Sequence, residues 1–298
     1  MSEMTLADRP APISARGRPF RSATSETPAT RLILILLAAG GLALLVGAPL
    51  AAVFAEALAQ GWSAAAASLQ SHDAMSAIRL TLLITAIAAP LNAVFGIAAA
   101  WFITKFDFRG KAFLITLIDL PFSVSPVVAG LCIVLLFGAN STLGGWLVAH
   151  GYPVVFAVPG IVLATVFVTF PFVARELIPV MIEQGRAEEE AALTLGASGW
   201  RTFCTVTLPN IRWALLYGTL LCTARAMGEF GAVAVVSGKI RGQTATMPIT
   251  IEMFYNEYLS VAAFSMAALL TSFALLTLML KTALELRHAD QLSATRRH

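Results

Sequence analysis

The stretch that decides the fold is E-A-A-L-T-L-G-A-S-G-W-R-T-F-C-T-V-T-L-P, which occupies residues 190–209 between two long apolar runs. With the charged residues directly before it, this stretch cannot lie in hydrocarbon. Strong helix formers precede Gly196, which permits the positive φ of a helix end, and Ser198 can cap a second helix through its hydroxyl. We expect Pro209 to close that second helix. The stretch therefore predicts two short helices around a turn, on the aqueous side of a membrane.

Composition agrees with a membrane location. Hydrophobic residues make up 58% of the chain and charged residues only 12%, so the chain lacks the polar surface of a soluble domain. Each apolar run exceeds the ~20 residues that a helix needs to cross ~30 Å of hydrocarbon. The sequence predicts an all-α integral membrane protein with six transmembrane helices. The expected runs are 32–54, 78–102, 112–137, 154–178, 211–236 and 259–280.

The basic residues divide unevenly between the two sides of such a bundle. Arg79, Lys239 and Arg241 fall on one side, whereas most of the others belong to the two tails and to the second and fourth connections. By the positive-inside rule, both termini and the hairpin are cytoplasmic. The basic residues assigned to the cytoplasmic side are Arg9, Arg16, Arg18, Arg21, Arg31, Lys105, Arg109, Lys111, Arg175, Arg186, Arg201, Arg212, Lys281, Arg287, Arg296 and Arg297.

The chain divides into three expected parts. Residues 1–31 mix Pro, Ser, Thr, Ala and Arg without apolar periodicity, which predicts a disordered cytoplasmic N-terminal tail. Residues 32–281 form the six-helix transmembrane domain, with the cytoplasmic hairpin at about 183–209. Residues 282–298 form a cytoplasmic C-terminal tail.

The sequence shows no pattern of a catalytic, cofactor or metal site. Its four histidines fall in connections or tails, where none is placed as a proton relay or as a metal-binding pair. Ser198 follows a helix rather than a strand, which favours a cap over a nucleophile. A G-x-x-x-x-G-K-[ST] phosphate loop is missing from the sequence, so we expect this chain neither to bind ATP nor to be an enzyme. Nothing in the sequence suggests a nucleic-acid partner.

Two ionisable residues lie in the fifth run. Arg225 and Glu229 are four residues apart in A-R-A-M-G-E-F-G, hence on one face of a helix. A charge near the bilayer centre costs at least ~2.5–3.5 kcal/mol unless it faces protein or water, so both must face inward. One interpretation is a structural ion pair that fixes packing. The other is a gate or pathway element whose arginine attracts an anion.

The third run carries the sequence I-D-L-P-F-S-V-S-P, which contains Asp119. Pro121 and Pro126 remove backbone donors and predict a kink or break between Leu120 and Pro126. Irregular backbone at this depth lines a cavity or faces protein. A packing kink is one interpretation, but the coincidence of acidic, hydroxyl and proline residues favours a pathway built on a discontinuous helix. The candidate pathway or gate residues are Asp119, Pro121, Ser123, Ser125, Arg225 and Glu229.

The fifth connection holds the basic cluster of the outer side. Lys239 and Arg241 lie between Gly238 and Gly242 in S-G-K-I-R-G-Q-T. A turn rich in exposed amides suits contact with an anion or with a soluble donor protein. An ordinary solvated loop is the alternative.

The hairpin resembles the EAA loop of ATP-binding-cassette importer permeases, written E-A-A, three residues, G, nine residues, I-x-L-P. Val206 stands in place of the usual Ile. The resemblance implies the MetI-like architecture of type I importers, and a loop that docks into a cleft of a separate cytoplasmic ATPase. The residues that match, and would couple to the ATPase, are Glu190, Ala191, Ala192, Gly196, Leu208 and Pro209.

The longer stretch A-R-A-M-G-E-F-G-A-V-A-V-V-S-G-K-I-R-G-Q-T, followed by Y-N-E-Y, resembles the W-type permease subunits of bacterial sulfate/thiosulfate importers. The similarity extends over about 78–287 and is densest over 188–258. It implies a heterodimer with a T-type permease in the bacterial inner membrane and two cytoplasmic ATPase subunits that hold ATP and Mg. A periplasmic sulfate-binding protein would deliver the substrate, and Lys239 and Arg241 are candidates for its contact.

Two other functions stay open on the sequence alone. Molybdate and tungstate permeases share the G-E-F-G element and the EAA loop, so these parts do not decide the anion. An ion-coupled secondary carrier would need its own energising groups within the membrane, and it has less support from the sequence.

Overall fold

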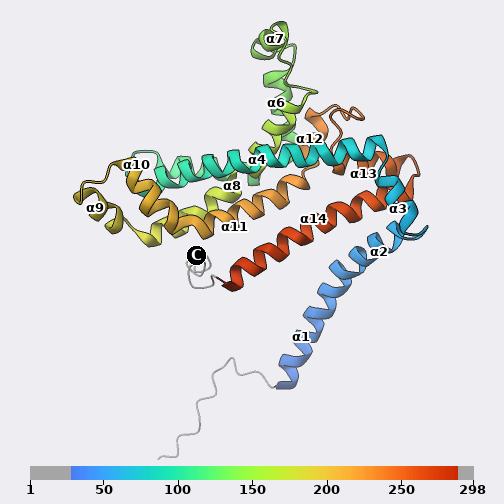
Figure 1. The fold of residues 1–298 in the computed structure, drawn as a ribbon, viewed down its shortest axis with the longest axis horizontal. Helices are drawn as coiled ribbons and strands as arrows, with labels where there is room; N and C mark the ends of the chain where they lie inside the picture. Colours follow the sequence, from blue (N-terminus) through green and yellow to red (C-terminus); the bar gives the residue numbers. More distant parts are fainter. Residues whose placement is uncertain (1–27, 288–298) are drawn as a thin grey trace, which may run out of the picture. The chain divides into compact units, whose positions relative to one another are not determined.

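The computed structural model describes residues 28–287, and every regular element within that part of the chain is a helix. This confirms the predicted all-α class. Two of the elements, η1 and η2, are short π-helical segments that join α-helices on both sides. The elements, shown in Figure 1, are α1 (Pro28–Leu42), η1 (Ala43–Gly47), α2 (Ala48–Ala57), α3 (Trp62–Leu69), α4 (His72–Lys105), α5 (Lys111–Ser123), α6 (Pro126–Phe137), α7 (Thr142–Ala149), α8 (Val158–Gln184), α9 (Ala187–Thr194), α10 (Gly199–Thr202), η2 (Phe203–Thr207), α11 (Leu208–Met227), α12 (Gly231–Val236), α13 (Met247–Asn256) and α14 (Ser260–Arg287).

Among the described residues, four helices are long and apolar enough to cross a membrane, and the bent pair α5 and α6 makes a fifth span if it is counted as one. These correspond to five of the six predicted runs. The remaining run, 211–236, is divided between α11 and α12, and α11 is less apolar because it carries Arg212 and Arg225. The four long apolar helices are Ala29–Ala57, His72–Lys105, Val158–Gln184 and Ser260–Leu286.

The chain separates into two compact units, Met1–Ala51 and Ala52–His298. The described part of the first contains α1, η1 and the beginning of α2, and all the sites discussed below belong to the second. Residues 28–31 of the expected N-terminal tail already belong to α1, whereas 1–27 lie outside the described residues. At the other end, α14 continues past the expected limit at residue 281 to Arg287, and 288–298 lie outside the described residues.

Helices α4, α8 and α11 form the centre of the second unit, and α14 packs along α11 (Figure 1). A small residue allows the close approach of α4 and α8. A Cβ atom at Gly96 would lie only 2.6 Å from Cγ1 of Val173, so glycine lets the two backbones meet. Leu177, Met181 and Ile211 are fully buried in the same core. These residues join α4, α8 and α11 in one buried core.

Buried polar groups also join the central helices. The Asn92 amide nitrogen of α4 donates to the Thr169 hydroxyl of α8 at 2.7 Å and lies 3.4 Å from the Cys222 sulfur of α11. The backbone N–H of Met247, at the start of α13, donates to the Thr81 hydroxyl at 2.9 Å. Interhelical hydrogen bonds of this kind are each worth about 0.6–2 kcal/mol in membranes. They fix the register of α4 against three neighbours.

The third predicted run breaks where the sequence indicated. Helix α5 ends at Ser123, α6 begins at Pro126, and the two axes differ by 107°. Pro121 stays inside α5 and is buried, so the break falls at the second proline. Pro126 lies in the first turn of α6, where its missing N–H costs nothing. Helix α6 then packs against α12 and α8.

Candidate functional site

The turn of the hairpin has the predicted geometry. Helix α9 carries Glu190, Ala191 and Ala192 and is followed by Gly196, whose φ is +87°. The N–H of Ala197 then donates to the carbonyl oxygen of Ala192 at 3.0 Å. Glycine commonly ends a helix in this way, because it adopts positive φ without steric cost.

The second helix of the hairpin begins as predicted but does not end as predicted. The Ser198 hydroxyl accepts from the Arg201 N–H at 3.4 Å and caps α10. Pro209 was expected to close this helix, and that expectation was wrong. Helix α10 passes into η2 and then directly into α11, whose first residues are Leu208 and Pro209.

The reason is the wider turn of η2. The N–H of Leu208 reaches back five residues to the carbonyl oxygen of Phe203, as in a π-helix. Such a turn accommodates the ring of Pro209, whose missing N–H would otherwise interrupt the ladder of an α-helix. The second helix of the hairpin is therefore continuous with α11.

The tip of the hairpin presents apolar side chains to solvent. Leu193, Leu195 and Trp200 are all strongly exposed, next to an acidic first turn of α9. Exposed apolar groups gathered on a projecting element are typical of a protein interaction site. Glu190 is exposed beside them, so its carboxylate is available to a partner.

Glu189, which the sequence did not single out, fastens the hairpin to the bundle. Its carboxylate lies 3.1 Å from the Lys105 ammonium at the end of α4 and accepts from the Thr207 hydroxyl at 2.6 Å. The Lys105 side chain is 8% exposed and that of Glu189 is 16% exposed. Lys105 also donates to the carbonyl oxygen of Gly185, the residue that ends α8. One lysine thus joins the ends of α4, α8 and α9.

Two further contacts support this junction. The Arg186 guanidinium lies 3.2 Å from the carboxylate of Asp107, in the α4–α5 connection. The Asn210 amide donates to the Glu188 carboxylate. Glu188 and Glu189, just before the E-A-A sequence, therefore have partners inside this chain, whereas Glu190 is exposed.

Arg225 and Glu229 form the ion pair that their spacing predicted. The closest guanidinium nitrogen of Arg225 lies 2.7 Å from a carboxylate oxygen of Glu229, although the contact lacks the alignment of a hydrogen bond. The other oxygen accepts from the N–H of Ala232 at 3.0 Å. The Glu229 side chain is only 1% exposed, against 35% for Arg225.

The helix breaks between the two residues. Arg225 belongs to the last turn of α11, which ends at Met227, and Glu229 lies before α12. Because Glu229 binds the first turn of α12, it links the two helices across their break. These contacts favour the structural interpretation of the pair. A small cavity of about 10 Å³, the size of one water, lies beside Glu229 and is also lined by Thr81, Thr165 and Thr246.

Asp119 also has an ionic partner, Arg175. The sequence indicated Arg175 only as a basic residue at the edge of the fourth connection. The Asp119 carboxylate lies 2.9 Å from Nε of Arg175 on α8. The guanidinium carbon of Arg175 lies 4.9 Å from the ring centroid of Phe122. Ser123 and Ser125, one turn further on, are exposed, and Ser125 precedes α6 without capping it. The break thus gathers Asp119, Arg175 and two hydroxyls on neighbouring positions.

Lys239 and Arg241 are both paired within the chain. The Lys239 ammonium lies 2.6 Å from the Glu252 carboxylate on α13. Arg241 lies 3.5 Å from Asp73 at the start of α4 and also pairs with Glu257. These contacts tie the α12–α13 connection to two helices and neutralise much of its positive charge. Contact with a binding protein stays a prediction.

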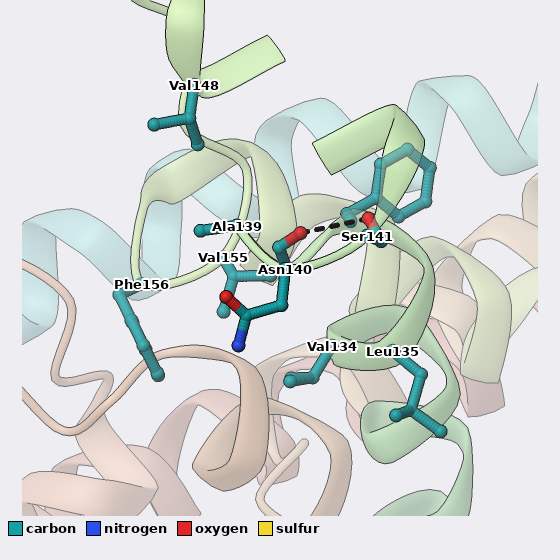
Figure 2. A pocket seen from close by; sticks show the side chains of 10 residues that line it. Val134, Leu135, Ala139, Asn140, Ser141, Val148, Val155 and Phe156 are labelled. Carbon is teal, nitrogen blue, oxygen red and sulfur yellow. Dashed lines mark hydrogen bonds between the residues drawn. The ribbon is translucent and has the colours of Figure 1, made fainter. Parts of the chain in front are cut away.

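A hollow of about 470 Å³ lies at the outer end of α6, next to α7. Figure 2 shows Val134 and Leu135 on one side and Phe156 on the other, with Asn140 between them. Its ten lining residues include no charged side chain. The Asn140 amide is the one side-chain N–H group among them, and without a cationic group the hollow is poorly suited to hold a dianion.

Comparison with known proteins gives one family over most of the chain. Residues 92–289 match the family described as binding-protein-dependent transport system inner membrane component. The sulfate transport system permease protein CysW of Escherichia coli strain K12 is 52% identical over 256 residues, which cover 84% of this chain and 88% of that protein. CysT, a sulfate transport system permease protein of the same strain, is 36% identical over 230 residues, covering 77% of this chain and 83% of CysT.

The fold has solved neighbours as well. A chain of a bacterial alginate ABC transporter, crystallised in complex with an alginate pentasaccharide-bound periplasmic protein, superposes with a TM-score of 0.69. The alignment covers 86% of this chain and 93% of that one at 17% sequence identity. At this identity the likeness supports the fold alone.

Proposed function

Because the chain belongs to the family of binding-protein-dependent transport system inner membrane components, we propose that it is the permease subunit of an ATP-driven importer of sulfate and thiosulfate. The observation that carries the proposal is the 52% identity to a sulfate permease over most of both chains. The W-type resemblance of the α12–α13 connection points the same way. Molybdate and tungstate import is the less supported alternative, since the relatives described above are sulfate permeases.

The proposed assembly contains several subunits. This chain would pair with a T-type permease, because CysT is itself a detectable relative. Two copies of a cytoplasmic ATPase, which hold ATP and Mg, would bind the hairpin tips of the two permeases. A periplasmic sulfate- or thiosulfate-binding protein would deliver the anion at the outer face. The natural location is the bacterial inner membrane, with both termini and the hairpin in the cytoplasm.

The hairpin geometry supports a mechanical form of coupling. Closure of the ATPase dimer would displace Leu193, Leu195 and Trp200 at the hairpin tip. That displacement passes along η2 into α11, because the helix is continuous there, and through Glu189 and Lys105 into α4. The breaks at 124–125 and 228–230 allow the outer half-helices α6 and α12, which pack on each other, to move relative to the inner halves.

The test is uptake by cells that lack this chain. Radiolabelled sulfate and thiosulfate uptake should be lost and should return when the chain is expressed, together with its partner subunits. Competition with unlabelled molybdate is the control for the anion, and it should reduce sulfate uptake little. Restored molybdate uptake without sulfate uptake would refute the assignment, as would uptake that is independent of the ATPase.

A further inference from the structure

The ion pair of Asp119 and Arg175 is exposed at a depth where charge is costly. Asp119 lies about 12 Å along α5 from its start at Lys111, and Arg175 about 13 Å from the end of α8 at Gln184, at 1.5 Å per residue. The Arg175 side chain is 58% exposed and that of Asp119 is 36% exposed. The other charged residues of these two helices are Lys111 at the start of α5 and Glu176 and Glu183 on α8.

Hydrocarbon is a costly environment for this pair. A charged side chain within a membrane faces a water-filled cavity or protein unless it can reach the interface. The pair therefore lies on the face of α5 and α8 that is turned toward an aqueous path or toward another subunit. The exposed hydroxyls of Ser123 and Ser125 lie on the next turn and at the helix break, and polar side chains of this kind favour the aqueous path.

The two arginines differ in how far their guanidinium groups are engaged by the rest of the chain. The closest contact between Asp119 and Arg175 is at Nε, 2.9 Å from the carboxylate, and it lacks the alignment of a hydrogen bond. Within residues 28–287, neither Nη group of Arg175 has a polar partner. Arg225 uses its guanidinium on a carboxylate that is almost fully buried, and removing it would leave that charge uncompensated. Of the two arginines, Arg175 is the one that can accept a ligand without disrupting the fold.

The geometry matches a tetrahedral oxyanion. The two Nη groups form a planar fork, which binds two oxygens of one anion at once. The Phe122 ring lies against the guanidinium at 4.9 Å from its centroid and limits its rotation. The Asp119 carboxylate lies on the Nε side, so the Nη edge is the side left for a ligand.

We propose that Arg175 contacts the permeating oxyanion within the membrane and that Asp119 is its positioning residue. This inference rests on the proposed import of sulfate and thiosulfate. The carboxylate next to the guanidinium keeps the net charge of the pair near zero and the affinity for a dianion low. A weak site suits transport, since the anion must leave as readily as it enters.

The test measures sulfate uptake per assembled importer. Cells that lack this chain receive wild-type or variant chain with the partner subunits, and complex assembly is measured by co-purification. Arg175→Ala should lower uptake at least tenfold at unchanged assembly. Uptake by the Arg175→Lys variant should lie between that of the wild type and that of Arg175→Ala, because an ammonium keeps the charge but loses the planar fork of N–H donors. Arg212→Ala is the matched control: Arg212 is exposed on α11 against Trp213 and should leave uptake unchanged.

Asp119→Asn separates positioning from structure. Without the carboxylate, the lone guanidinium should hold the anion longer, so the apparent KM and the maximal rate should both fall severalfold. A structural role alone would lower the maximal rate and leave KM unchanged. Wild-type uptake by Arg175→Ala would overturn the inference, and so would a loss of uptake that merely follows a loss of assembly.

A second readout does not depend on the transported anion. Cys132, Cys204 and Cys222 are replaced, and Arg175→Cys is treated with an anionic, membrane-impermeant methanethiosulfonate reagent in the assembled complex. Rapid modification from the aqueous phase supports a position in the path. Absence of reaction would overturn the inference even if the wild-type importer transported sulfate normally. Failure of wild-type chain to restore sulfate uptake would instead refute the proposed function.

Discussion

Single side chains decide how firmly the hairpin is attached. Glu189 and Lys105 form a largely buried pair with a hydroxyl and a carbonyl oxygen completing its contacts. Losing one member of a buried pair leaves the other charge uncompensated, which typically costs about 3–5 kcal/mol. By comparison, the exposed pair of Lys111 and Asp107, at 3.9 Å, should contribute less than about 0.5 kcal/mol.

Lys105→Met should therefore uncouple the importer. We expect ATP hydrolysis by the assembled complex to continue while sulfate uptake falls at least fivefold, because the hairpin no longer moves α4. Glu189→Gln should have a smaller effect, since its amide oxygen can still accept from Thr207. Lys111→Met is the control and should retain normal uptake. Equal effects of Lys105→Met and Lys111→Met would show that the buried junction has no role in coupling.

Arg225 and Glu229 provide a second prediction at this scale. Arg225→Met should reduce the yield of folded chain by leaving the buried Glu229 unpaired, at a cost of roughly 3 kcal/mol. Glu229→Gln keeps an oxygen for the N–H of Ala232 and should cost less. The double variant should recover most of the loss of Arg225→Met. Thermal stability of the purified complex measures this, and a strictly additive double variant would exclude structural pairing.

At the scale of helices and turns, the sequence predicted most of the helix ends, caps and breaks. The end of α9 at Gly196, the cap at Ser198 and the break before Pro126 follow from the backbone preferences of glycine, serine and proline. The continuation through η2 did not follow. A π turn has the same composition as an α turn, so Pro209 was mistaken for a helix end.

Ion-pair partners that lie far apart in the sequence were not predictable from it either. The sequence identifies Arg175 and Lys105 only as basic residues of one side of the membrane. Nothing in the neighbouring sequence indicates which carboxylate lies opposite each of them. Their partners Asp119 and Glu189 lie on other helices, and only the packing of α8 against α5, and of the hairpin against α4, brings them together. By contrast, the spacing of four residues predicted the pairing of Arg225 with Glu229, although the helix breaks between them and Glu229 lies outside α11.

The turn of the hairpin yields a prediction for the element. Gly196→Val forces a β-branched residue to φ +87°, which costs about 1–2 kcal/mol or more. No atom lies within 4 Å of the new Cβ, so the effect acts through the backbone, and the tip should be misplaced. Membrane insertion should be normal, while sulfate uptake falls strongly and ATP hydrolysis loses its dependence on the binding protein.

A second glycine supplies the control for that experiment. Gly110, at φ +101°, also has open space around its Cβ position and lies in the α4–α5 connection, outside the hairpin. Gly110→Val therefore carries similar backbone strain without displacing the tip. If both variants lost uptake to the same extent, strain in general rather than the position of the hairpin would be responsible.

At the scale of the whole molecule, the native cysteines report the orientation of the chain. Cys204 is exposed on η2 and Cys222 is buried in the bundle. In sealed membrane vesicles that contain the protein, an impermeant maleimide should label Cys204 only when the cytoplasmic face is accessible. It should not label Cys222 before denaturation. A Cys204→Ser variant provides the background. Labelling of Cys204 in intact spheroplasts would place the hairpin on the outer side and contradict the assigned topology.

The 107° angle between α5 and α6 also governs how the chain is made. Helices of 13 and 12 residues are only about 20 and 18 Å long, too short to cross ~30 Å of hydrocarbon separately. The insertion machinery must therefore accept 111–137 as one continuous apolar segment. Helices α8 and α12, which pack on α6, leave the ribosome later, and we expect their packing to hold the bend at its final angle. Nascent chains truncated before residue 231 should hold this segment straight, which distance measurements between labels at 115 and 135 would reveal.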